Sequence, residues 1–304
     1  MSRTVVFSAY GGPEVLRVVD VEPDEPPAGM IRVRVRAAGV QPFDALFRGG
    51  GAHAYMPATF PQRLGNEFAG VVDAVGEGVT GVAAGDEVVG WAMLASYAEH
   101  VVVPPDQVAP KPASMPWPEA GVLSASGQTA DTALERLRVG AGDTVLVHAA
   151  AGGVGTFAVQ IARALGATVV GTASERNHAY LRDLGVIPVA YGEGLAERVR
   201  AAAPGGVDAA LDAAGTVEAL EVSAALVADR TRAGTIAYQP AADRIGVQRL
   251  GTERSAARLG RLTALWEKGD LKVRIQEAIP VEEAARAHTL IESGHTTGKL
   301  VLVF

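Results

Sequence analysis

Apolar residues near the middle of the chain follow strand spacing, then helix spacing, then strand spacing again. Residues 145–147 form a short uninterrupted apolar run, which is typical of a buried parallel strand. Beyond a turn of small residues, apolar side chains recur at helical intervals, at Val154, Phe157, Ala158, Ile161, Ala162 and Leu165. Residues 168–172 then predict a second strand. The pattern indicates a βαβ unit, whose crossover is expected to be right-handed.

The turn between this strand and this helix reads Ala-Ala-Ala-Gly-Gly-Val-Gly. A turn of this kind brings bare backbone N–H groups close to a pyrophosphate, and the helix N-terminus favours the negative charge. The G-x-G-x-x-G positions are Ala150, Gly152 and Gly155, and Gly153 and Val154 belong to the same predicted cofactor-binding turn. Ala150 departs from the first glycine, so the turn must tolerate a methyl group. A tight βα turn without a ligand is the alternative.

Period-two alternation and short strands dominate the first third of the chain. Apolar residues at 31, 33, 35 and 37 alternate with three arginines, which predicts a strand with one solvated face. Other strands are predicted over 4–10, 16–21, 87–91 and 97–103. A helix is predicted over 42–48, with Asp44 and Arg48 paired at i,i+4 spacing. Many short strands with glycine turns suggest a small, barrel-like β domain.

The remaining chain predicts alternating strands and helices. A strand and turn are expected over 208–215, strands over 234–238 and 298–304, and helices over 253–269 and 281–292. We therefore expect an α/β protein with a Rossmann-type doubly wound parallel sheet and a β-rich, barrel-like substrate domain. The expected boundaries are 1–115 for the β-rich domain, 116–252 for the dinucleotide-binding domain and 253–304 for a segment that completes the first domain.

Composition narrows the class of protein. The chain has 304 residues, 48% of them hydrophobic, which is enough for two domains and a large core. No apolar run reaches about 18 residues and the N-terminus has no signal-peptide pattern, so neither a membrane span nor export is expected. A net charge of −7 without a basic tract argues against nucleic-acid binding. The absence of cysteine excludes disulfides and thiolate metal sites and suits a cytoplasmic protein.

The residues after the second predicted strand bear on cofactor choice. An NAD site usually has an acidic residue there, which binds the ribose 2′-OH. Here Ser174 occupies that position and Arg176 follows. Serine removes the repulsion and arginine can hold a 2′-phosphate, so NADPH is expected. Glu175 would favour NAD if it points inward, and Arg176 as an ordinary surface charge is the alternative.

Several segments taken together resemble a known family. They are residues 37–44, 65–70, 85–86, 148–155 and 288–303. In order and spacing they are similar to the medium-chain dehydrogenase/reductase superfamily, and within it to the zinc-lacking quinone oxidoreductase (zeta-crystallin-like) branch. The resemblance covers essentially the whole chain. It implies a GroES-like substrate domain, a small-molecule quinone or enone acceptor, and a homodimer, although residues 239–250, used for pairing in similar enzymes, are shortened here.

The resemblance also identifies what is missing. Zinc-dependent relatives have a cysteine and a histidine where this chain has Gln41 and Asn66, and Glu67 alone is not a zinc site. No metal is therefore expected. Gln41 is the best candidate to donate a hydrogen bond to the acceptor, and Tyr55 is the second, as a donor or a stacking ring. Similar enzymes often have a tyrosine where Leu46 stands, which makes this pocket more apolar.

Two further cofactor contacts are implied by the same resemblance, and the start of the final predicted strand offers a third candidate. Thr129 matches a threonine near the nicotinamide, with an ordinary helix hydroxyl as the alternative. Tyr191 matches a tyrosine that contacts the 2′-phosphate. Lys299 could reach the cofactor phosphates or the substrate, and an exposed lysine at the start of a strand is equally plausible.

The sequence therefore predicts an NADPH-dependent, zinc-independent reductase that transfers hydride to a quinone or an activated enone. An enoyl or alkenal double-bond reductase of a biosynthetic pathway is the alternative among enzymes. An NADPH-binding protein with a structural or non-redox role is the alternative of a different class.

Overall fold

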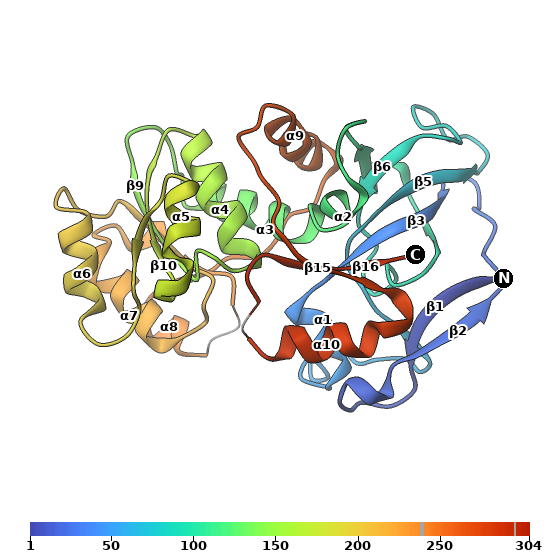
Figure 1. Ribbon diagram of the computed structural model, residues 1–304, viewed down its shortest axis with the longest axis horizontal. Helices are drawn as coiled ribbons and strands as arrows, with labels where there is room; N and C mark the ends of the chain where they lie inside the picture. The colour runs from blue at the N-terminus through green and yellow to red at the C-terminus, as the bar shows by residue number, and fades with distance from the viewer. Residues whose placement is uncertain (238–239, 295) are drawn as a thin grey trace. The chain divides into compact units, whose positions relative to one another are not determined.

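The computed structural model describes residues 1–237, 240–294 and 296–304, which form two compact units (Figure 1). We call them the β-rich unit and the α/β unit. The β-rich unit contains Met1–Ala125, Arg254–Ala264 and Val273–Phe304, and the α/β unit contains Ser126–Glu253 and Leu265–Lys272. Both chain ends therefore belong to the β-rich unit. Within the described ranges, no helix has the length and apolar character that crossing a membrane requires.

One parallel sheet organises the α/β unit. Its strand order is β11-β10-β9-β12-β13-β14. The strands are β9 (Thr144–His148), β10 (Thr168–Thr172), β11 (Ile187–Val189), β12 (Ala209–Asp212), β13 (Ala233–Thr235) and β14 (Gln248–Arg249). Counted along the chain this is the order 3-2-1-4-5-6 of a doubly wound dinucleotide fold, with the reversal at β9. The predicted fold class is confirmed.

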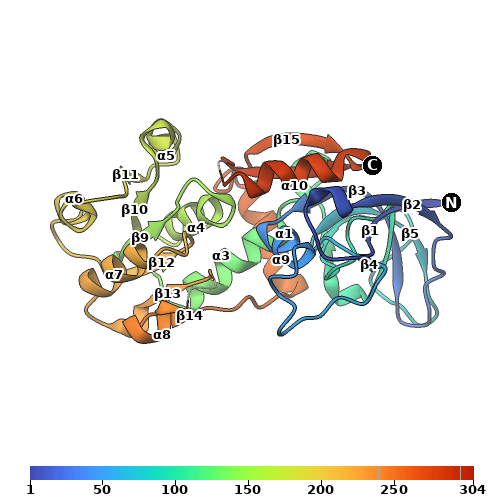
Figure 2. The ribbon, with the colours of Figure 1, turned by 90° about the horizontal axis from the view of Figure 1, so that it is seen from below.

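Helices pack against this sheet, so its central strands are apolar without interruption. They are α3 (Ser124–Arg136), α4 (Gly153–Ala164), α5 (His178–Asp183), α6 (Leu195–Ala202), α7 (Val217–Leu226) and α8 (Ala241–Ile245). Helix α4 packs on β9 and β10 (Figure 1), and α7 packs on β12 and β13 (Figure 2). Leu146, Val170 and Leu220 are completely buried in this core. The predicted strand, turn, helix and second strand are confirmed.

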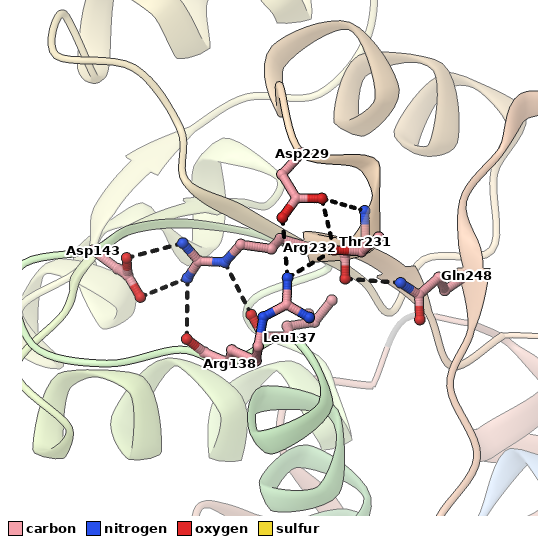
Figure 3. Close-up of polar contacts among 7 residues, drawn as sticks. All are labelled: Leu137, Arg138, Asp143, Asp229, Thr231, Arg232 and Gln248. Atoms are coloured by element: carbon pink, nitrogen blue, oxygen red, sulfur yellow. Dashed lines mark hydrogen bonds and ion pairs between the residues drawn. The ribbon is translucent and has the colours of Figure 1, made fainter.

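A polar network joins the segment before β9 to the segment before β13 (Figure 3). Arg232 pairs with Asp143 at 2.6 Å and donates to the main-chain oxygens of Leu137 and Arg138. The hydrogen bonds from Arg232 lower the pKa of the Asp143 carboxyl. Arg138 pairs in turn with Asp229 at 3.0 Å. These contacts fix one end of the sheet and leave the carboxyl ends of the strands to the site.

The β-rich unit contains two sheets. The larger has the order β15-β16-β3-β5-β6-β8, with β7 also paired to β3, and the smaller has the order β2-β1-β4. The strands are β1 (Ser2–Phe7), β2 (Arg17–Val21), β3 (Ile31–Val40), β4 (Gln62–Arg63), β5 (Phe68–Val75), β6 (Glu87–Gly90), β7 (His100–Val103), β8 (Val108–Pro110), β15 (Ile275–Pro280) and β16 (Lys299–Val303). The last strand of the chain, β16, thus pairs with β3 from the first part.

Four helices complete the β-rich unit or connect to it. They are α1 (Pro42–Arg48), α2 (Trp117–Ala120), α9 (Ala256–Glu267) and α10 (Ala284–Glu292). Helix α10 packs on β15 and β16 beside β3 (Figure 2). Phe7, Phe47 and Phe68 lie in the core.

Two details differ from the sequence predictions. The expected Asp44–Arg48 ion pair is wrong, because Arg48 pairs with Glu292 of α10 and Asp44 is bound by other groups. The strand expected over 234–238 is β13, which ends at Thr235, and Tyr238 lies outside the described residues. Helix spacing cannot show that a buried side chain has a better partner on a distant helix.

Candidate functional site

The glycine turn between β9 and α4 is held by its own backbone. Ala149 adopts a φ of 53°, in the left-handed region. The Ala150 amide donates to Thr172 O at 2.9 Å, and the Gly152 amide donates to Ala149 O at 2.9 Å. The buried methyl group of Ala150 is accommodated because its neighbour on β10 is Gly171, where a Cβ would lie 2.7 Å from that methyl. This is how the turn tolerates alanine at its first motif position.

The amides that follow are the groups able to hold an anion. Gly152 is the N-cap of α4, and no side chain in the described part of the chain caps the helix. Within the described ranges, the N–H groups of Gly153, Val154 and Gly155 have no protein acceptor. Unsatisfied amides at a helix start, together with the helix dipole, suit a phosphate group. A pyrophosphate therefore fits this turn through Gly153–Gly155, while the Ala150 and Gly152 amides shape it.

The carboxyl ends of β10 and β11 lie beside this turn in the sheet. The Ala173 amide donates to Val189 O at 3.0 Å, which joins the two strand ends. Ser174 is half-buried, and its hydroxyl accepts a hydrogen bond from the Asn177 side chain, from Nδ2 to Oγ at 3.2 Å. Arg176 is exposed. Tyr191 is 60% exposed just after β11. Glu175 is also exposed, so two opposite charges follow Ser174.

Polar side chains also end the neighbouring strands. His148 at the end of β9 contacts Thr172 Oγ1 through Nδ1 at 3.3 Å, and burial lowers its pKa to about 4. Asp212 accepts from the Ala214 amide at 2.8 Å and from Thr235 Oγ1 at 2.7 Å, so it acts as a turn carboxylate. Thr129 Oγ1 lies 2.8 Å from Thr252 Oγ1.

A second polar cluster lies in the β-rich unit around Glu67, which is completely buried. Its carboxylate accepts from Gln41 Nε2 and from the Ala125 amide at 2.6 Å, and it pairs with Lys299 at 3.4 Å. A Cβ on Gly39 would overlap this carboxylate, so the glycine makes room for it. Lys299, predicted as a cofactor contact, is thus 4% exposed and has a carboxylate partner.

Asp44 organises the other half of this cluster. It accepts from the Gln41 amide at 2.9 Å, from Asn66 Nδ2 at 2.6 Å and from Tyr97 Oη at 2.8 Å. Burial raises the pKa of Asp44 to about 6, although these three hydrogen bonds oppose the shift. Gln41 is therefore fixed at both its backbone and its side chain, and one N–H of its amide remains for a ligand.

The raised pKa of Asp44 predicts a pH dependence of stability. The carboxyl titrates near 3.8 when unfolded and near 6 when folded, so the folded state binds more protons between these values. The contribution of Asp44 to the free energy of unfolding is therefore full below pH 4. It declines by on the order of 3 kcal/mol as the pH rises through 6. Urea unfolding of wild type and Asp44→Asn from pH 4 to 7 should show this decline in the difference between the two. The control Asp20→Asn, at an exposed carboxylate, should show the same pH dependence as wild type. If the free energy of unfolding of Asp44→Asn also changed with pH as in wild type, the raised pKa of Asp44 would be contradicted.

Zinc does not fit this cluster. A catalytic zinc site needs three protein ligands of thiolate, imidazole or carboxylate type. Here Gln41 and Asn66 offer amides, and the Glu67 carboxylate is already bound by an amide, a backbone N–H and an ammonium. No group of three potential His, Cys, Asp or Glu ligands occurs in the part of the chain that the structure describes.

Tyr55, the second residue predicted to contact the hydride acceptor, takes no part in these hydrogen bonds. Tyr55 is 60% exposed in the loop after α1, and Leu46 on α1 is 45% exposed. Sequence reasoning did not identify Tyr97 or Arg254 as site residues. Tyr97 binds Asp44, and Arg254 Nη1 donates to Asn66 O at 3.3 Å. No local spacing connects these residues, so only the fold brings them together.

Fold and turn together define a two-unit dehydrogenase-like protein with a dinucleotide site. Comparison agrees: the alcohol dehydrogenase GroES-like domain family matches residues 27–113, and the zinc-binding dehydrogenase family matches residues 184–302.

Individual relatives refine the class. The quinone oxidoreductase of Pseudomonas aeruginosa is 34% identical over 339 aligned positions, covering 100% of both chains. The crystal structure of Escherichia coli quinone oxidoreductase complexed with NADPH superposes with a TM-score of 0.87 at 29% identity, covering 100% of both chains. The CurK enoyl reductase structure gives a TM-score of 0.88 at 26% identity, covering 99% of both chains. The chain belongs to the medium-chain dehydrogenase/reductase superfamily, in its quinone oxidoreductase branch.

Proposed function

We propose that this protein is an NADPH-dependent reductase that transfers hydride to a quinone or an activated enone without zinc. The observation that carries the proposal is the turn of Gly153–Gly155, whose amides lack protein acceptors beside a serine and an arginine at the end of β10. Family membership supports the same cofactor class, since the similar Escherichia coli structure contains NADPH.

The α/β unit would hold the cofactor. The Gly153–Gly155 amides bind the pyrophosphate, and the Arg176 guanidinium, with the Ser174 hydroxyl and the Tyr191 ring, receives the 2′-phosphate. Thr129, Ala150 and Gly152 of this unit, and Lys299 of the β-rich unit, are further proposed cofactor contacts. When bound, NADPH supplies the hydride.

The β-rich unit would hold the acceptor. Gln41 has one amide N–H bound to Glu67, which orients the second toward a ligand oxygen. Tyr55, exposed in its loop, is proposed to stack on the acceptor or donate to it. Because the donors of the cluster do not suit zinc, the acceptor oxygen is polarised by hydrogen-bond donors instead.

A second candidate reaction is reduction of an enoyl or alkenal double bond. The similarity to the CurK enoyl reductase favours it, as does the apolar Leu46, which is 45% exposed on the helix that begins after Gln41. An aliphatic chain would pack on leucine without the aromatic stacking that a quinone prefers.

Turnover of NADPH tests the proposal. Purified protein treated with a chelator and checked for zinc by metal analysis should oxidise NADPH with members of a panel of quinones, enones and enoyl thioesters. The class of acceptor with the highest turnover decides between reduction of a quinone or activated enone and reduction of an enoyl or alkenal double bond. NADPH binding without turnover on any acceptor would favour a structural or non-redox role, and activity that depends on added zinc would refute the metal-free mechanism.

Arg176→Ala should weaken NADPH binding much more than NADH binding. A guanidinium–phosphate hydrogen bond contributes about 1.5–3 kcal/mol, so the dissociation constant for NADPH should rise about tenfold to 150-fold. Fluorescence titration with both nucleotides measures the difference. Arg182→Ala, an exposed arginine on α5, is the matched control. Equal losses for NADPH and NADH would remove Arg176 from the phosphate site.

We also propose a homodimer. Among the strands that the structure describes, β14 is the last in the parallel sheet, beside β13, and its two residues, Gln248 and Arg249, are exposed. Sedimentation velocity tests the assembly, and a monomer at micromolar concentration would refute it.

A further inference from the structure

Arg254 is a half-buried cation without a carboxylate partner among the described residues. Two other arginines of the β-rich unit have carboxylate partners: Arg48 pairs with Glu292, and Arg32 pairs with Asp73 at 3.0 Å. Arg254 instead makes one long hydrogen bond, from Nη1 to the main-chain oxygen of Asn66 at 3.3 Å. Four of its five N–H donors are therefore left for water or a ligand.

The charge of Arg254 is not neutralised by the neighbouring carboxylates. Glu67 is already bound by Lys299, Gln41 and the Ala125 amide, and Asp44 by Tyr97, Asn66 and the Gln41 backbone. Both carboxylates are near enough to attract Arg254, but burial lowers its pKa more than they raise it. A guanidinium stays protonated under these conditions, so a positive charge with unused donors remains beside the cluster.

Asn66 supplies a second observation that points to a ligand. Its side chain is 2% exposed, and Nδ2 donates to Asp44. Its Oδ1 is buried and has no hydrogen-bond partner among residues 1–237, 240–294 and 296–304. Buried polar atoms without partners are rare and costly, so such an atom usually faces a missing water or ligand. The residue that anchors Arg254 through its backbone thus offers an unused acceptor on its side chain.

We propose that Arg254 binds the acceptor's carbonyl oxygen and stabilises the negative charge that develops there during reduction. The inference rests on the proposed function. Hydride from the dihydronicotinamide forms a C–H bond at the conjugate carbon of the quinone or enone, and the π electrons move onto the oxygen. NADP⁺ is released from the reaction, and the oxyanion, held by the guanidinium, takes a proton from water. The resulting hydroxyl has an acceptor in Asn66 Oδ1. Arg254 thus supplies the positive charge that a metal would otherwise provide.

Two measurements test this role, one with turnover and one without. Arg254→Gln should lower kcat about 10²-fold on the best acceptor, the loss typical of one oxyanion donor, with NADPH affinity unchanged. Arg254→Lys should recover part of the activity, because it keeps the charge without the planar fork. Arg34→Gln, an exposed arginine on β3, is the control and should resemble wild type.

The second measurement uses 4-nitrophenol, whose anion has its own absorption band. Wild type should bind it as the phenolate and lower its apparent pKa, and Arg254→Gln should abolish that shift, while Arg34→Gln keeps it. A wild-type shift that needs Arg254, in a protein that reduces none of the acceptors, would refute the proposed function and leave the anion site standing. Wild-type-like kcat in Arg254→Gln, or a phenol pKa that does not depend on Arg254, would overturn the inference.

Discussion

Gly155→Ala should remove NADPH binding and destabilise the α/β unit. A Cβ at this position would overlap the main-chain oxygen of Ala149 and lie 2.8 Å from the Cα of Ala150. These are backbone atoms of the turn, so no side-chain rotation relieves the clash, and either α4 or the turn must move. Overpacking of this kind costs about 1–3 kcal/mol. Displacing the Gly153–Gly155 amides from the pyrophosphate should raise the NADPH dissociation constant more than 100-fold, on the order of 3 kcal/mol.

Thermal unfolding and nucleotide fluorescence measure the two effects in one preparation. Gly140→Ala is the matched control, because its Cβ would meet no atom within 4 Å and should leave both quantities unchanged. Gly152→Ala should have an intermediate effect on both thermal stability and NADPH affinity, since its Cβ would be 3.2 Å from Ala149 O. Wild-type NADPH affinity in a folded Gly155→Ala would show that the turn does not hold the pyrophosphate.

The βαβ unit could be predicted because every signal for it is local. The apolar run of β9, the helical spacing of α4 and the glycines between them are adjacent in the sequence, and the structure reproduces all three. The alanine at the first motif position was also expected to be tolerated. The reason for the tolerance, Gly171 on the next strand, becomes visible only when β9 and β10 pair.

The polar cluster of the β-rich unit could be predicted only in part. Resemblance to the family identified Gln41 and Asn66 as the residues that stand where zinc-dependent relatives have metal ligands, and the structure shows which groups bind them. The partners Tyr97, Arg254 and Lys299 come from distant parts of the chain, so no spacing connects them with Asp44 or Glu67. The Asp44–Arg48 pair failed for the same reason, because local helix geometry competes with tertiary partners that the sequence does not show.

Glu67→Gln should cost more stability than any surface substitution. The change keeps the shape of the side chain but removes the carboxylate charge that lies 3.4 Å from the Lys299 ammonium, which is 4% exposed. Removing one partner of a buried ion pair costs about 3–5 kcal/mol, because the remaining charge is buried and uncompensated. Urea unfolding of the nucleotide-free protein measures the loss. The pair of Arg32 with Glu25 provides the control because the Glu25 side chain is 84% exposed, and Glu25→Gln should change stability by less than about 1 kcal/mol.

The double variant Glu67→Gln/Lys299→Met distinguishes the contribution of the Glu67–Lys299 ion pair from that of the other hydrogen bonds of Glu67. If the cost of Glu67→Gln comes from the lost attraction between the two charges, removing the ammonium as well should recover most of it, and the double variant should be more stable than Glu67→Gln alone. Gln41 donates to one carboxylate oxygen of Glu67 and the Ala125 amide donates to the other, so the single side-chain oxygen of glutamine keeps one of these two hydrogen bonds. Additive losses from the two single changes would mean that Glu67 stabilises the unit through these amides rather than through Lys299.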